Sequence, residues 1–207
     1  MTNQAHKTRR NAPSKLRVTA GAFKNTPLKV PDSARPVMER VKLAVFSVIN
    51  EYIEGAECLD LFAGSGNLGI EALSRGASSC DFVDDDFFSI KYIRENLEKI
   101  QASFNAEIEF NTIKDDSLKY VANTDKFYDI IFIDPPYSQD NHKHLFKLIN
   151  EIVKPTGIIV YLSNHTNKIH DNLEEINANL TVVDSRKYGI THVDIIKIKD
   201  KEHPVKL

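Results

Sequence analysis

Short apolar runs alternate with segments of helical spacing along most of this chain. The apolar runs predict strands near residues 57–62, 79–83, 107–111, 128–133, 157–162, 180–187 and 193–199. Helical spacing predicts helices near residues 67–75, 87–100, 116–122, 141–153 and 167–177. This alternation is typical of an α/β fold with a mostly parallel, doubly wound sheet. Because only a short connection joins the last two strands, we expect them to pair as an antiparallel hairpin.

The first 54 residues follow a different pattern. Residues 16–23 and 28–30 suggest a short hairpin, and residues 37–52 have the spacing of a helix that packs on the sheet. We expect four parts in order: a disordered basic tail at 1–14, an extension of hairpin and helix at 15–54, the α/β domain at 55–200, and a C-terminal tail at 201–207.

A glycine-rich turn follows the strand near 57–62 and leads into a helix. Its residues 63–69 read Ala-Gly-Ser-Gly-Asn-Leu-Gly. Glycines let a ligand approach the backbone closely, and the helix start presents free N–H groups. Asp84 lies about 20 residues past Gly64, at the end of the next strand, where an acidic side chain can bond ribose hydroxyls. This spacing is formally that of a dinucleotide site, so a nicotinamide-dependent oxidoreductase is one open interpretation.

A second motif closes the strand near 128–133. Asp134, Pro135, Pro136 and Tyr137 lie at its carboxyl end, where ligands bind in open α/β sheets. Neither proline has an N–H group, and each holds the preceding residue extended, so carbonyl oxygens gather beside a carboxylate. This acceptor cluster suits a planar exocyclic amine, which can donate its hydrogens to Asp134 and a proline carbonyl while its ring stacks on Tyr137. We predict that these four residues are catalytic.

The position of Asp60 distinguishes a dinucleotide from a cofactor that carries a methionine group. It precedes Gly64 by four residues, where a carboxylate repels a diphosphate and attracts the ammonium group of a methionine moiety. The acceptor cluster at Asp134 has no use in hydride transfer but fits an amine that awaits a methyl group. Both observations favour S-adenosylmethionine over a dinucleotide.

Together the two motifs resemble class I methyltransferases that modify exocyclic amines of bases. With segments 17–21, 35–46, 60–76 and 186–191, the chain is similar to the bacterial 16S ribosomal RNA guanine-N2 methyltransferases, the RsmD family. The resemblance implies a Rossmann-like, seven-stranded sheet, S-adenosylmethionine as cofactor, and 16S rRNA or the assembling small ribosomal subunit as partner. The cofactor-binding residues that we predict are Asp60, Phe62, Gly64, Ser65, Gly66, Asp84 and Asp116. The chain departs from the family at Asp84, where glutamate is usual, and at Ile190, where a polar residue is usual.

Two further polar residues lie at the same predicted edge of the sheet. Asp116 opens the helix after the third strand. The resemblance implies that it contacts the adenine amine of the cofactor, and a role as helix N-cap fits equally well. His165 follows the fifth strand, and we assign it no role.

The distribution of charge points to a nucleic-acid partner although the net charge of −2 does not. Residues 1–42 hold ten Lys or Arg against two acidic residues, a net charge of +8, which leaves −10 for the remainder. A basic segment beside an acidic domain suits contact with phosphates. The RNA-binding residues that we predict are Arg17, Lys24, Lys29, Arg35 and Arg40. Arg35, Arg40 and Lys42 are placed on the polar face of the predicted leading helix. The alternative interpretation of this face is a surface that contacts only solvent.

The composition limits the other classes of protein to which this chain could belong. Hydrophobic residues make up 42% of the 207 positions, as in an ordinary globular protein. No apolar stretch approaches the roughly 20 residues of a membrane span, and the N-terminus lacks the apolar region of a signal peptide. Cys58 and Cys80 have no metal-ligand spacing and fit buried reduced thiols. We therefore expect a cytoplasmic monomer without a metal or a membrane contact.

Two rival functions share the same motifs. An adenine-N6 DNA methyltransferase would use the same acceptor cluster, although no target-recognition domain is recognisable in a chain of this size. A noncatalytic RNA-binding assembly factor would keep the fold, but it would have no use for the intact motif at residues 134–137.

Overall fold

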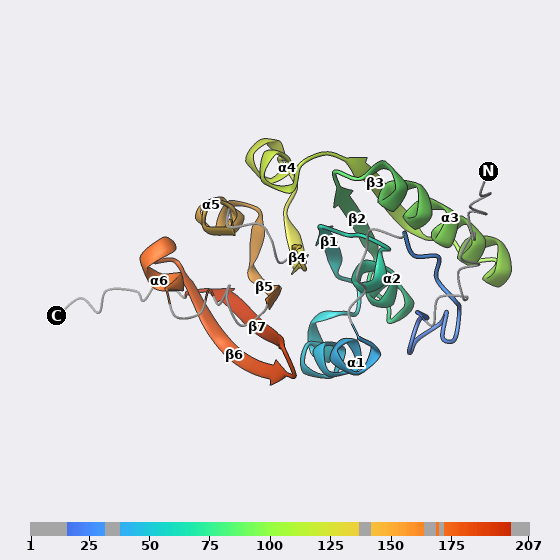
Figure 1. The fold of residues 1–207 in the computed structure, drawn as a ribbon, viewed down its shortest axis with the longest axis horizontal. Helices are drawn as coiled ribbons and strands as arrows, with labels where there is room; N and C mark the ends of the chain where they lie inside the picture. Colours follow the sequence, from blue (N-terminus) through green and yellow to red (C-terminus); the bar gives the residue numbers. More distant parts are fainter. Residues whose placement is uncertain (1–15, 32–37, 137–141, 164–168, 170–171, 200–207) are drawn as a thin grey trace, which may run out of the picture.

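The computed structural model describes residues 16–31, 38–136, 142–163, 169 and 172–199 (Figure 1). The predicted tails at 1–14 and 201–207, together with Arg35, Tyr137 and His165, lie outside the described residues.

A seven-stranded sheet forms the centre of the molecule. Its strand order is β3-β2-β1-β4-β5-β7-β6, with β1 to β5 parallel and β7 antiparallel to both β5 and β6. The strands are β1 (Glu57–Leu61), β2 (Ser79–Asp84), β3 (Glu109–Lys114), β4 (Tyr128–Ile133), β5 (Val153–Ser163), β6 (Leu180–Tyr188) and β7 (Thr191–Ile198). The predicted α/β class, the strand count and the antiparallel final hairpin are confirmed.

Helices cover both faces of the sheet (Figure 1). The helices are α1 (Glu39–Val48), α2 (Asn67–Ser74), α3 (Phe87–Phe104), α4 (Ser117–Asn123), α5 (His142–Leu148) and α6 (Leu173–Ile176), with 3₁₀ turns η1 (Asn50–Tyr52) and η2 (Ile149–Glu151). One apolar core joins the sheet to α1, α2 and α3, and a second core joins the opposite face to α4, α5 and α6. None of the described helices has both the length and the apolar character needed to cross a membrane.

The starts of three strands differ from the prediction by two residues or more. β3 begins two residues later than expected and extends to Lys114, because an edge strand that is only half buried carries a weak apolar pattern. β5 begins at Val153, four residues early, where it pairs with Tyr128 before a register shift. β7 begins at Thr191, also two residues early. None of these differences changes the edge of the sheet at which a strand ends.

The predicted N-terminal hairpin is shorter than expected. Its ladder is a single antiparallel bridge between Arg17 and Pro27, with further backbone bonds on either side. The intervening turn bonds instead to α2, where the Ala22 N–H donates to the Ser74 carbonyl at 2.6 Å. Gly21 makes this approach possible, because a Cβ at that position would lie 1.8 Å from the Ser74 oxygen. The segment is therefore docked on a helix rather than built as a two-stranded ribbon.

Candidate active site

The predicted motifs meet at the point where the strand order reverses. From β1 the chain proceeds outward through β2 and β3, and it then returns to β4 on the other side of β1. Leu61 at the end of β1 pairs with Val83 of β2 and with Ile133 of β4, so the loops that follow these strands emerge at one level. Ligands of open α/β sheets bind in the crevice at such a switch point.

The glycine turn is held in a left-handed conformation by specific hydrogen bonds. Phe62, Gly64 and Gly66 have φ angles of 57°, 55° and 74°. The Gly64 N–H donates to Asp84 Oδ2 at 2.7 Å, and the Gly66 N–H donates to the Ala63 carbonyl at 2.7 Å. A side chain in this region costs roughly 1–2 kcal/mol, so the conformation of Phe62 indicates a turn that its surroundings over-determine.

Asp84 connects two loops of this edge. Besides the bond to Gly64, its Oδ1 accepts the N–H of Asp86 at 2.9 Å. Each carboxylate oxygen can accept more than one hydrogen bond, so Asp84 still has acceptor capacity for a ribose hydroxyl. Ribose binding by this residue stays a prediction.

Asp60 lies beneath the glycine turn. It is 1% exposed, and its Oδ2 accepts the N–H of Gly69 at 2.9 Å, which ties the first turn of α2 to β1. Ser65 is also buried, and its carbonyl accepts the side-chain amide of Asn96 at 3.4 Å. These contacts give Asp60 and Ser65 a bracing role, and direct contact of either with a cofactor stays a prediction.

Three acidic side chains lie near one another at this edge of the sheet. Burial raises the pKa of Asp60 well above its ordinary value, and the neighbouring charges of Asp134 and Asp84 raise it further. Burial also raises the pKa of Asp84, and it raises the pKa of Asp134 to about 7. A cationic ligand would relieve this accumulation of acidic groups, whereas an anionic ligand would add to it.

The structure describes three of the four residues of the motif that follows β4. Asp134 is half-buried, Pro135 is buried and Pro136 is exposed, so the chain leaves the sheet for the surface within three residues. The carboxylate of Asp134 follows the buried strand as predicted. Because Tyr137 lies outside the described residues, its stacking role stays a prediction.

Asp116 is the N-cap of α4. Its Oδ1 accepts the N–H of Lys119 at 2.9 Å, which confirms the capping role expected of this position. The side chain is exposed, and contact with a cofactor adenine stays a prediction.

Four of the five predicted RNA-binding residues are described, and all four are exposed. Lys24 is exposed on the docked N-terminal turn, and Arg40 lies beside Gly189 in the turn between β6 and β7, where a Cβ would meet its guanidinium at 3.2 Å. Lys29 forms an ion pair with Glu95 at 2.6 Å, and Arg17 lies 3.8 Å from Glu39. Lys29 is therefore the most strongly neutralised of the four.

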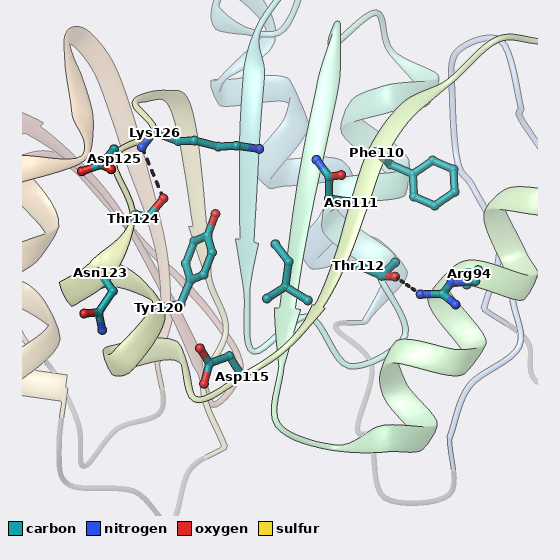
Figure 2. Close-up of a pocket in the computed structure, with 11 residues that line it drawn as sticks. Arg94, Phe110, Asn111, Thr112, Asp115, Tyr120, Asn123, Thr124, Asp125 and Lys126 are labelled. Atoms are coloured by element: carbon teal, nitrogen blue, oxygen red, sulfur yellow. Dashed lines mark hydrogen bonds between the residues drawn. The ribbon is translucent and has the colours of Figure 1, made fainter.

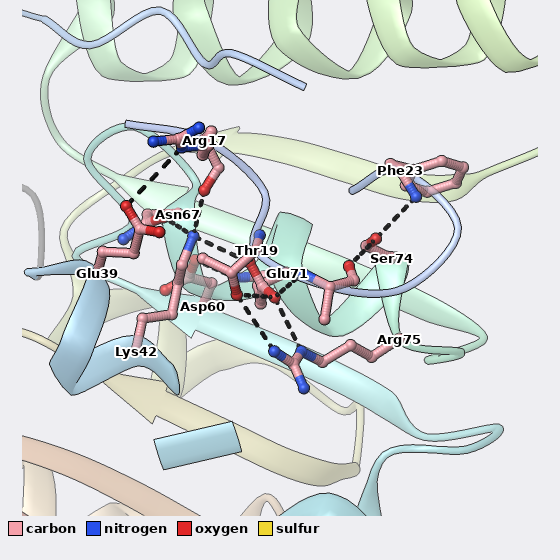
Figure 3. A network of polar contacts seen from close by, with 12 residues as sticks. Arg17, Thr19, Phe23, Glu39, Lys42, Asp60, Asn67, Glu71, Ser74 and Arg75 are labelled. Carbon is pink, nitrogen blue, oxygen red and sulfur yellow. Dashed lines mark hydrogen bonds and ion pairs between the residues drawn. The ribbon is translucent and has the colours of Figure 1, made fainter. Parts of the chain in front are cut away.

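The prediction for Lys42 was wrong. We expected its side chain on the polar face of α1, but the side chain is fully buried. Its ammonium group donates to the Arg17 carbonyl and to Asn67 Oδ1, each at 2.7 Å, and lies 2.9 Å from Glu71 Oε2 (Figure 3). The sequence carried a signal for this burial, since Lys42 is spaced three and four residues before Val45 and Phe46 on the apolar stripe of the helix.

Glu71 is the hub of this polar network. It accepts the N–H of Thr19 at 2.8 Å and that of Ala20 at 3.0 Å, and Arg75 Nε lies 2.8 Å away (Figure 3). Burial disfavours its charge, but Lys42 and the bonds from Thr19 more than offset that effect and hold the pKa of Glu71 below its ordinary value. Sequence reasoning missed this hub, which joins the N-terminal segment to the helix that follows the glycine turn.

A separate depression of about 800 Å³ lies along the edge strand β3 (Figure 2). Arg94 of α3 and Tyr120 of α4 flank it. Behind it, the buried Asp81 carboxylate accepts hydrogen bonds from Lys126 and Asn111, both at 2.7 Å, and from Tyr128 at 2.8 Å. These donors satisfy Asp81, so the cluster supports the sheet edge and lies apart from the switch-point crevice.

The described residues contain neither an exposed thiol nor a cluster of potential metal ligands. Cys58 and Cys80 are buried free thiols, and burial raises the pKa of both. Across the part of the chain that the structure describes, no three His, Cys, Asp or Glu side chains are grouped so that they could hold a metal ion.

Comparison with known proteins gives a consistent picture. The family model described as "Conserved hypothetical protein 95" matches residues 16–197. YlbH of Bacillus subtilis (strain 168), provisionally assigned as an rRNA methyltransferase, is 37% identical over 186 residues, which cover 88% of this chain and 98% of that protein. Ribosomal RNA small subunit methyltransferase D of Haemophilus influenzae is 35% identical over 153 residues, covering 72% of this chain and 79% of that protein. The solved structure of yhhF from Escherichia coli, provisionally assigned as a methyltransferase, has a TM-score of 0.76 and 25% identity, covering 89% of this chain and 98% of that one.

Proposed function

The chain belongs to the Conserved hypothetical protein 95 family, the family of the small-subunit rRNA methyltransferases D, and from that premise we propose its reaction. The proposed reaction is transfer of a methyl group from S-adenosylmethionine to the exocyclic N2 amine of a guanine in 16S ribosomal RNA. The observation that carries the proposal is the cluster of three acidic side chains, Asp60, Asp84 and Asp134, at the glycine turn.

The acidity of this cluster supports the choice of cofactor. S-adenosylmethionine carries a sulfonium and an ammonium group, and either cation would favour the ionised forms of the three acidic side chains. A dinucleotide would instead bring the negative charges of its diphosphate to the same place. Asp84 would accept ribose hydroxyls with its remaining acceptor capacity, and the N–H groups at the start of α2 would suit the cofactor's carboxylate.

The proposed role of Asp134 is to orient the amine that accepts the methyl group. When bound, the cofactor supplies an electrophilic methyl group on sulfur. Asp134 and the carbonyls before the prolines would accept the N–H hydrogens of the amine and hold its nitrogen toward the glycine turn. The amine becomes acidic only as its new bond to carbon forms, so the carboxylate stabilises developing positive charge and takes the proton late.

The substrate assignment is supported by the relatives and by the exposed basic residues of the N-terminal segment and α1. The Haemophilus relative is named for methylation of small-subunit ribosomal RNA. Arg17, Lys24 and Arg40 of this chain are exposed and available to phosphates. A base that reaches Asp134 must be unstacked, which favours a loop or an exposed end of the RNA.

Mapping of the methyl group tests the proposal directly. The purified protein is incubated with labelled S-adenosylmethionine and either unmethylated small-subunit RNA or DNA, and the nucleosides are analysed by mass spectrometry. The expected product is N2-methylguanosine in RNA. N6-methyladenine in DNA, or binding of NADH with no binding of S-adenosylhomocysteine, would contradict the proposal. Asp134→Asn is the matched control, and it should bind S-adenosylhomocysteine without producing label.

A further inference from the structure

The turn between β6 and β7 stands at the same edge of the sheet as Asp134. Ile133, the residue before Asp134, is level with Tyr161 of β5, which in turn is level with Asp194 of β7. Because β7 runs opposite to β5, the chain enters β7 from beyond the carboxyl end of β5. β7 is two strand positions from β4, which is about 10 Å at the usual strand spacing. The turn therefore rises beside Asp134 and above its level.

The strand order leaves one half of this edge for the RNA. The glycine turn follows β1 on one side of β4, and the proposed cofactor belongs there. The ends of β5, β7 and β6 lie on the other side of β4. An RNA that delivers a base to Asp134 is therefore expected to lie over this second half, where the turn between β6 and β7 projects.

The turn presents an apolar side chain on a firm support. Ile190 is 60% exposed, the highest value among the large hydrophobic residues that the structure describes. Tyr188 pairs with Thr191, so the connection is a two-residue hairpin turn, and Gly189 supplies the positive φ angle of 66° at its first position. Tyr188 packs against the core and Thr191 is buried. Ile190 is thus held at a fixed place, with its side chain in solvent.

Cations lie on both sides of this apolar tip. The guanidinium of Arg40 in α1 lies against the turn, where a Cβ at Gly189 would meet it at 3.2 Å, and the end of β6 lies beside α1 in Figure 1. Tyr188 faces the core that includes α1, so the preceding Lys187 projects from the opposite face of the hairpin. Both cations are exposed. Asp184, the acidic residue of β6, is paired with Arg186 at 2.8 and 2.9 Å, which reduces its repulsion of phosphates.

An apolar tip between two cations matches RNA better than it matches a protein. Protein interfaces need contiguous apolar area and are depleted in lysine. A nucleic acid offers phosphates to the cations and flat base faces to the apolar side chain. Proteins that distort nucleic acids use isoleucine and similar side chains as wedges between bases.

We propose that Ile190 is a wedge that enters the base stack beside the target guanine, and that Arg40 and Lys187 hold the flanking phosphates. This inference rests on the proposed function and adds the means by which the base is released from its stack. A guanine that reaches Asp134 leaves a gap between its neighbours, and opening that gap costs free energy. Apolar contact of Ile190 with the exposed base faces offsets part of this cost. A polar side chain at the same place would not.

Methylation kinetics on two RNAs test the wedge. Both are fragments of small-subunit RNA that contain the guanine located by methyl mapping. One keeps this guanine in its stack, and the other has nucleotides without bases on both sides of it, so no unstacking is needed. Ile190→Ser should lower kcat/KM about 10-fold on the stacked RNA and less than about 2-fold on the other. Equal losses on the two RNAs, or no loss on the stacked RNA, would overturn the proposal.

Two further variants separate the wedge from a general effect of the substitution. Ile190→Leu keeps an apolar side chain and should match the parent protein on both RNAs. Val183→Ser makes a similar change at a residue of β6 that is 52% exposed and lies further from the turn, and it should also leave both rates unchanged. A loss for Val183→Ser equal to that for Ile190→Ser would count against a specific role of the tip.

Fluorescence of 2-aminopurine placed next to the target guanine reports unstacking without turnover. With S-adenosylhomocysteine present, the parent protein should raise the fluorescence of the stacked RNA when it binds, and Ile190→Ser should bind this RNA but lose most of the rise. A full rise with Ile190→Ser would overturn the wedge. If the parent protein methylates neither RNA, the proposed function itself fails, and that result is distinct from failure of the wedge alone.

Discussion

The ammonium group of Lys42 lies 2.9 Å from the carboxylate of Glu71 in the interior of the protein, and neither side chain is exposed. A buried ion pair offers little net stabilisation over an apolar pair, but removal of one partner leaves the other charge without compensation. This pair also joins α1 to α2, and Glu71 binds the N-terminal segment through Thr19. Its integrity therefore affects both the fold and the helix that begins the crevice.

Replacement of Lys42 by Met should destabilise the protein by about 3–5 kcal/mol, because it leaves the Glu71 carboxylate buried with one cation fewer. Urea unfolding measures the loss. Lys91→Met is the matched control, because Lys91 is half exposed and its nearest carboxylate, on Glu95, lies 3.9 Å away. The control should change stability by no more than about 0.5 kcal/mol. The double variant Lys42→Met with Glu71→Gln should lose less than the sum of its parts, and full additivity would show that the pair is not coupled.

Alanine substitutions at Gly21 and Gly55 distinguish the stability cost of backbone strain from the cost of a steric clash. Both have positive φ angles, 82° and 72°. An added Cβ at Gly21 would lie 1.8 Å from the Ser74 carbonyl oxygen, whereas one at Gly55 would meet nothing within 4 Å. Gly55→Ala should therefore cost about 1–2 kcal/mol. Gly21→Ala should cost about 3 kcal/mol or more and expose the Ala22 amide to hydrogen exchange, because the N-terminal turn must leave α2. Similar losses for the two variants would contradict the close docking of this turn.

The sequence could predict those parts of the site whose positions depend only on the order and direction of the strands. Apolar runs identified β1, β2 and β4, and parallel strands must end at one edge, so Asp84 and Asp134 were placed correctly beside the glycine turn. The cap at Asp116 could also be predicted, because a helix N-terminus requires an acceptor within a few residues.

The parts that could not be predicted depend on contacts between residues far apart in the chain. Thr19 and Glu71 are 52 positions apart, and Lys42 and Asn67 are 25 positions apart. Periodicity reports which face of a helix is apolar, but it carries no information about which distant polar group satisfies a buried charge. The hydrogen bond from the Gly69 N–H to Asp60 was also missed, although both residues had been recognised as part of the motif.

The exposed cations of the N-terminal segment and α1 should differ in their contribution to RNA binding. Lys24→Ala and Arg40→Ala should each weaken binding and lower the slope of log affinity against log salt by about 1, as expected when one phosphate contact is lost. Lys29→Ala should have a smaller effect, because Lys29 is already paired with Glu95 at 2.6 Å. Lys147→Ala is the control, since Lys147 is exposed at the C-terminal end of α5, which packs on the opposite face of the sheet from α1 and α2. Filter-binding titrations at several salt concentrations provide the comparison, and an equal effect of Lys147→Ala would rule out this surface as the RNA contact.

The ionisation of Asp134 should control both catalysis and stability. Burial raises its pKa to about 7 in the free protein, and only the carboxylate form can accept the hydrogens of the amine. The value of kcat/KM for RNA should therefore rise with pH and level off above about 7, because this parameter reports ionisation of the free enzyme. A rate that does not vary between about pH 6 and 8 would exclude Asp134 as the group whose ionisation limits the reaction.

The same ionisation predicts the effect of Asp134→Asn on unfolding. The pKa is about 7 in the folded protein and about 3.9 in an unfolded chain, so the folded state holds the proton more tightly. The stability that this proton contributes is complete below about pH 4, declines as the pH rises, and is lost above about 7. Asp134→Asn cannot ionise, so above pH 7 it should be more stable than the parent by on the order of 1–3 kcal/mol, and the difference should shrink toward pH 4. Asp116→Asn is the matched control, because it makes the same chemical change at an exposed position and keeps an N-cap acceptor. Urea titrations across this range provide the measurement, and a gain for Asp134→Asn that is the same at every pH would mean that the carboxyl group is not shifted in the folded protein.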